Sequence, residues 1–154
     1  MKARFSTLFA ILALVIFLSA SGGDASAQRL AAPKTDLPAT LSYQGYVKYN
    51  GNPYNGIGYF KFALIDSDGA SRWSNDGSSS GGAVPDSSLA LSVSNGLFSV
   101  QLGDTSLPNM TQPLTPAVFD APAPALRVWF SPDNLVFTLL APDRPLSAAP
   151  YAFL

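Results

Sequence analysis

The sequence predicts an all-β protein: an antiparallel β-sandwich of about seven strands, preceded by a signal-peptide helix that is cleaved. Short apolar stretches alternate with clusters of Gly, Pro, Asn, Asp and Ser, at the spacing typical of a sandwich or barrel. Beyond the first 27 residues, no window keeps a helical period for more than about two turns. Long connections between the strands favour a sandwich over a closed barrel.

The first residues have the form of an export signal. Lys2 and Arg4 precede an unbroken apolar run at 8–18, and a small-x-small pattern ends at Ala27. The run has only about half of the roughly 20 residues that a helix needs to cross a membrane. We therefore expect cleavage between Ala27 and Gln28 and a secreted or cell-surface protein; an uncleaved anchor is the alternative. No Cys follows the run, which excludes a lipid-modified bacterial N-terminus.

The mature chain is expected to hold a polar, Pro-containing lead-in at 28–40 and one β-sandwich domain at 41–154. Seven Lys and Arg against nine Asp give residues 28–154 a formal net charge of −2, without runs of either sign. Nucleic acid and anionic lipid both require a concentrated positive field. We therefore expect no nucleic-acid partner, and no membrane partner after signal cleavage.

Cysteine is absent from the whole sequence. Small exported domains often depend on disulfides, so this one must be stabilised by apolar burial and sheet hydrogen bonds alone. The absence fits a bacterial or archaeal exported protein better than a eukaryotic secreted one.

The strands are predicted from alternating apolar residues between turn-forming clusters. In chain order they are 41–49, 57–66, 71–75, 88–94, 97–102, 125–131 and 135–141. The second is expected to turn Phe60, Phe62 and Leu64 inward, and the sixth to turn Leu126, Val128 and Phe130 to one face. A turn containing Pro53 joins the first two strands, and 76–82 is expected to be a mobile surface loop that buries nothing. Five prolines exclude a central strand from 107–124, which is interpreted as an extended crossover with Phe119 as its anchor.

One hairpin is predicted in detail. Residues 88–94 alternate strictly, and Asn95-Gly96 is the preferred pair for a two-residue type I′ turn, because both positions need a positive φ. Such a turn pairs Ser94 with Leu97 and fixes the rest of the register. The further opposed pairs on the inward face are Val93 with Phe98, Leu91 with Val100, and Leu89 with Leu102.

The residue types exclude most catalytic chemistry. The sequence contains no His, no Cys and no Glu, which removes Ser-His and Cys-His relays, imidazole and thiolate metal sites. Residues 66–69 (DSDG) begin like a calcium loop but lack the acidic residue that closes one, so a β-turn is the preferred interpretation. No catalytic residue, metal site or cofactor is predicted.

Aromatic residues supply one competing functional hypothesis. Tyr54, Trp73 and Trp129 are candidate contacts for a sugar or a partner protein, provided that their rings lie on the surface. The preferred interpretation is that such rings are buried, because a small domain without disulfides needs their apolar area.

Several segments together resemble a known kind of module. They are LSYQGY at 41–46, NGNPYNG at 50–56, SNGLFSVQLG at 94–103, and the PYA ending at 150–152 that follows Arg144 and Leu146. The pattern resembles the β-rich head of secreted bacterial surface proteins, which commonly precedes collagen-like, coiled-coil or tail-fibre-like repeats. The resemblance covers about 41–153 and implies a structural role. It also implies a homo-oligomer if a longer form carries a stalk; a fragment, a shortened gene and a free-standing version stay open.

These observations lead to a ranked set of functions. The first is an exported, non-catalytic structural or adhesion-type module of the cell surface or extracellular matrix, with an unknown protein or glycan as partner. The second is a carbohydrate-binding module that uses exposed Tyr and Trp. The third is an Asp-dependent hydrolase, for which no second tuned group is evident.

Overall fold

The computed structural model describes residues 40–146, and within them the predicted all-β class is confirmed. The signal peptide with its Ala27–Gln28 cleavage site, nearly all of the lead-in, and the PYA ending lie outside the described residues. The strands are β1 (Leu41–Tyr46), β2 (Lys48–Tyr49), β3 (Asn52–Pro53), β4 (Gly56–Ile65), β5 (Ser71–Ser74), β6 (Leu89–Val93), β7 (Leu97–Leu102), β8 (Ala125–Ser131), β9 (Thr138–Leu139) and β10 (Arg144–Pro145), with one 3-10 helix, η1 (Pro116–Asp120). No helix in this part of the chain is long and apolar enough to cross a membrane.

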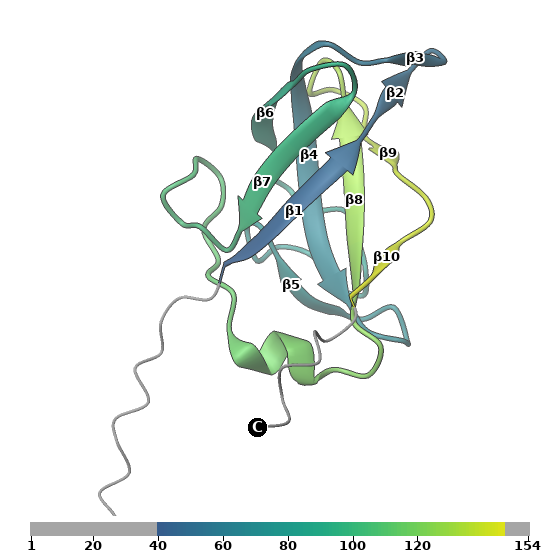
Figure 1. Ribbon diagram of the computed structural model, residues 1–154. Coiled ribbons are helices and arrows are strands. Elements are labelled where there is room, and N and C mark those ends of the chain that lie inside the picture. The colour runs from purple at the N-terminus through teal and green to yellow at the C-terminus, as the bar shows by residue number, and fades with distance from the viewer. Residues whose placement is uncertain (1–39, 147–154) are drawn as a thin grey trace, which may run out of the picture. The chain divides into compact units, whose positions relative to one another are not determined.

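Two antiparallel sheets of unequal size form the sandwich. The six-stranded sheet has the order β10-β8-β4-β5, with β6 also paired to β4 and β9 to β8, whereas the smaller sheet pairs β1 with β7. In Figure 1 the β1–β7 ribbon crosses in front of β4 and β8. Strands β4, β7 and β8 each contribute alternate residues to the buried core: Phe60, Phe62, Leu64, Phe98, Val100, Leu102, Leu126, Val128 and Phe130. The inward faces predicted for these three strands are confirmed.

Aromatic rings join the two sheets at the centre. The Phe60 ring of the large sheet lies with its centroid 4.2 Å from that of Phe98 in the small sheet, and 5.1 Å from that of Phe130. Phe98 in turn lies over Gly45 of β1, where a Cβ atom would come within 2.3 Å of the ring. The Phe98 ring can lie across its partner strand in this way only because position 45 has no side chain.

The predicted hairpin is right at its turn and wrong beyond it. Asn95 and Gly96 have φ values of 48° and 82°, and Ser94 and Leu97 exchange two backbone hydrogen bonds of 2.9 Å. After that pair the strands separate, because β6 pairs with β4 in the large sheet and β7 pairs with β1 in the small one. The pairs predicted further along the hairpin therefore do not form. Alternation directs a strand's apolar side to the core whichever strand lies beside it, so periodicity does not identify the partner.

Two predicted strands are interrupted or shortened. The strand predicted at 41–49 breaks at Val47, whose side chain is buried, and a small β2–β3 hairpin follows. The strand predicted at 135–141 is reduced to the two residues of β9, and Leu135 and Val136 lie on the surface. The two-residue strand β10 was not predicted.

The crossover at 107–124 is anchored by other residues than expected. Phe119, the predicted anchor, is 38% exposed, whereas Met110, Leu114 and Val118 are buried in the core. The expectation that 76–82 buries nothing is also wrong, because Gly82 is buried and its carbonyl accepts a hydrogen bond from Arg127. Small residues can be buried in loops when neighbouring polar groups satisfy their backbone.

Candidate binding groove along strand β1

A groove of about 670 Å³ runs along strand β1, between that strand and the segment at 139–146. Phe98 and Val128, which belong to the buried core, contribute to its lining. The far wall is held to the large sheet, since the Leu140 amide donates to the Val128 carbonyl over 2.8 Å. The volume is within the range of about 300–1,000 Å³ that is usual for ligand sites.

The groove-side edge of β1 carries backbone groups that no other strand of the described part of the chain pairs. Among the described strands, β1 pairs only with β7, and the Val47 amide donates to the Gly96 carbonyl at the end of that ladder. Since hydrogen bonding alternates along an antiparallel pair, residues 41, 43 and 45 also point their backbone groups at β7. The N–H and C=O groups of Ser42, Gln44 and Tyr46 therefore point away from β7.

This edge lacks the features that usually protect edge strands. Residues 41–46 contain no charge and no proline, and their pairing with β7 continues through six residues without a bulge. Natural proteins protect such edges with Lys, Pro, bulges or a covering segment. Across the groove, β9 and β10 have two residues each, and neither pairs with β1. Within residues 40–146, no strand covers this side of the sandwich.

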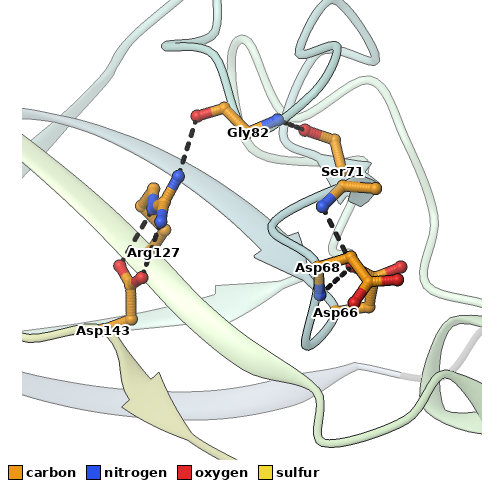
Figure 2. A network of polar contacts seen from close by, with 7 residues as sticks. Asp66, Asp68, Ser71, Gly82, Arg127 and Asp143 are labelled. Carbon is orange, nitrogen blue, oxygen red and sulfur yellow. Dashed lines mark hydrogen bonds and ion pairs between the residues drawn. The ribbon is translucent and has the colours of Figure 1, made fainter.

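The groove is positively charged although the whole chain is slightly acidic. Lys48 and Arg144 line it, and no Asp or Glu does among the described residues. The nearby Asp143 does not neutralise Arg144, because its two carboxylate oxygens accept hydrogen bonds of 3.0 and 2.7 Å from Arg127. These hydrogen bonds raise the pKa of Arg127, and burial opposes them. Figure 2 shows the pair, together with the Arg127 contact to Gly82.

The three aromatic residues singled out in the sequence do not form an exposed platform. Trp73 and Trp129 are each only 7% exposed, and the Trp73 indole donates to the Gln112 carbonyl. Trp73 pairs across from Leu64 on the core face, whereas Trp129 pairs across from Lys61 on the opposite face of the same sheet.

Tyr54 lies apart from both tryptophans. It is half-buried, its hydroxyl donates to the Ile57 carbonyl over 2.8 Å, and its ring contacts Phe130 edge-on. Each of the three rings thus has a packing role within the domain.

The segment resembling a calcium loop is a hydrogen-bonded turn. One Asp66 oxygen accepts from the amides of Asp68 (3.0 Å) and Ala70 (2.9 Å), and the other accepts from Arg72. Figure 2 shows this carboxylate turned onto its own backbone. The Ala70 hydrogen bond, with those from Arg72 and Asp68, lowers the pKa of Asp66 in spite of desolvation. Within residues 40–146, no three Asp, Glu, His or Cys side chains gather as a metal-binding group.

The groove was not anticipated from the sequence. The one signal for it is the uncharged stretch LSYQGY, which lacks the charges and prolines of a protected edge strand. That signal becomes meaningful only when the topology shows that β1 is an edge.

The comparisons with known proteins give one match. A family model described as a domain of unknown function (DUF8740) matches residues 42–143, which include β1 from its second residue and the part of the far wall at 139–141. Neither the search of curated proteins nor that of solved structures found a match.

Proposed function

Because the chain belongs to the DUF8740 family of domains of unknown function, we propose a function from its own residues: an exported, non-catalytic structural or adhesion-type module of the cell surface or extracellular matrix. The observation that carries the proposal is the uncharged edge of β1 beside the groove, which no second strand pairs within residues 40–146. Such an edge is suited to association with another polypeptide through backbone hydrogen bonds.

The N-terminal sequence supports export. A basic start, a short apolar run and a small-x-small site are the parts of a secretory signal. The resemblance to β-rich heads of secreted bacterial surface proteins supports the same destination.

The state of the carboxylates favours a non-catalytic role. A carboxyl acid-base catalyst generally needs a pKa raised toward the working pH. Here the Ser106 side chain and amide lower the pKa of Asp104. The Leu135 amide and the Ser131 hydroxyl lower that of Asp133. Both carboxylates thus serve to hold local turns.

The carbohydrate-binding alternative has less support. Stacking on a sugar needs ring faces open to solvent, and Trp73 and Trp129 are buried.

The test is expression of the full chain in a bacterial host with a general secretion pathway. We expect the exported protein to begin at Gln28 by mass spectrometry and to be recovered outside the cytoplasm. An Ala27→Leu variant, which destroys the small-x-small site, should accumulate as the uncleaved form. A full-length chain that stays in the cytoplasm would overturn the proposal.

A further inference from the structure

We propose that the groove binds an extended, acidic and partly apolar segment of a partner protein, which adds to β1 as a further antiparallel or parallel strand. The inference rests on the proposed function, because it specifies the partner of the same surface. It is carried by the backbone geometry of β1, the shape of the groove and its charge.

The backbone of β1 provides the first recognition element. Ser42, Gln44 and Tyr46 alternate along the edge, and each directs one N–H and one C=O group away from β7. An added strand would satisfy these groups whatever its sequence, as in other cases of recognition by strand addition.

The groove has room for a strand and apolar side chains to receive it. The six residues of β1 extend about 20 Å at roughly 3.3 Å per residue, and the volume beside them is about 670 Å³. Three apolar lining residues are substantially exposed: Tyr46 at 49%, Leu97 at 61% and Leu139 at 41%. A strand with alternate apolar side chains would cover this surface.

Charge selects the kind of segment. Lys48 and Arg144 line the groove without an acidic neighbour in the lining, so carboxylates on the bound strand would be attracted to them. A second copy of this chain pairing through β1 would bring only LSYQGY, which has no acidic residue. The observations therefore favour an acidic partner segment over self-association.

The probe is a phage-displayed library of random nine-residue peptides, selected against the full chain as exported. We expect the selected peptides to alternate apolar residues and to be enriched in Asp and Glu. Lys48→Glu combined with Arg144→Glu should weaken a synthetic selected peptide about tenfold. Both side chains are exposed, so the fold should be unaffected.

A matched pair of proline variants tests strand addition. Gln44→Pro removes an amide on the groove side of β1 without removing a β1–β7 hydrogen bond, and should abolish binding. Ser99→Pro removes the amide directly across the ladder, which points to the opposite edge of the small sheet, and should leave binding intact.

Amide hydrogen exchange of the unmodified chain gives an independent measurement if a proline variant fails to fold. Bound peptide should slow exchange at Ser42, Gln44 and Tyr46, while residues 41, 43 and 45 are protected already in the free protein.

Four outcomes would overturn the inference: selection of basic peptides, selection of no peptide, binding that Gln44→Pro does not affect, or a dimer of the free chain that Gln44→Pro dissociates. In each case correct export would leave the proposed function standing. Retention of the chain in the cytoplasm would instead refute the proposed function without bearing on peptide binding.

Discussion

Replacement of Asn75 by alanine should destabilise the domain more than any other single polar-to-alanine change that we predict. Asn75 is completely buried at the end of β5. Its side-chain oxygen accepts from the Phe62 amide over 3.0 Å, and its Nδ2 donates to the carbonyls of Ser87 (2.9 Å) and Asn109 (3.1 Å). The side chain thus connects β4, the end of the loop before β6, and the crossover.

The magnitude follows from those three contacts. Alanine removes all three hydrogen bonds and leaves three backbone groups without partners. Each buried unsatisfied group costs about 1–3 kcal/mol, and partial relaxation or entry of water reduces the sum, so we expect a loss of about 3–5 kcal/mol. That is a large part of the roughly 5–15 kcal/mol by which a domain is stable. The melting temperature should fall by at least about 10 °C.

The assay is urea and thermal unfolding of the exported chain, followed by circular dichroism. Asn52→Ala is the matched control, since Asn52 is exposed and its side chain makes a single 3.3 Å hydrogen bond within the β2–β3 turn. The control should remain within about 0.5 kcal/mol of the parent. If Asn75→Ala also stays within about 1 kcal/mol, then Asn75 does not hold these segments together and the reasoning is refuted.

Three further predictions concern other parts of the domain. Gly45→Ala should lower the free energy of unfolding in urea by at least about 1–3 kcal/mol, because the new Cβ would meet the buried Phe98 ring at 2.3 Å. Ser42→Ala on the same strand is the control. Equal urea midpoints for the two variants would contradict the close approach of the Phe98 ring to position 45. Asp143→Ala should lower the free energy of unfolding by about 1–2 kcal/mol, because it removes the bidentate contact with Arg127. Restored stability in an Arg127→Met, Asp143→Ala double variant would show that the unpaired cation is responsible. An unchanged urea midpoint in the single variant would contradict the prediction. The pKa values of four carboxyls lie below their ordinary value of 3.8: those of Asp66, Asp76, Asp104 and Asp133. Their contribution to the stability of the fold is therefore complete above pH 3.8 and is lost as the pH falls through the lower pKa of the folded state. Urea midpoints should be constant between pH 5 and 8, where the chain has no His to titrate, and a midpoint that rises below pH 4 would show the sign to be wrong.

The structural features that were predicted correctly are those that depend on residues close together in the chain. The bounds of β7 and β8, the inward faces of β4, β7 and β8, and the turn at Asn95-Gly96 are all local properties of alternation and turn chemistry. The crossover was recognised as irregular from its prolines, but its anchors were not. Met110, Leu114 and Val118 are buried because of where the crossover lies against the core, and local sequence does not specify that position.

The groove could not be predicted from the sequence for the same reason that the predicted hairpin register was wrong. Both depend on which strands become neighbours, which is a long-range property that alternation does not encode. A sequence shows that LSYQGY is uncharged, but only the pairing shows that one edge of this strand has no neighbour.

The two sides of the small sheet differ in how they are linked to the large sheet within the described residues. Strand β6 leaves the hairpin and pairs with β4, so the turn at Asn95-Gly96 connects the small sheet to the large one on the β7 side. On the β1 side no described strand makes the corresponding connection, and the facing segment offers only the two-residue strands β9 and β10. An added strand would give β1 a second neighbour beside β7, so the edge of β1 that no described strand pairs, rather than any cluster of reactive side chains, is the feature of this domain best suited to recognition.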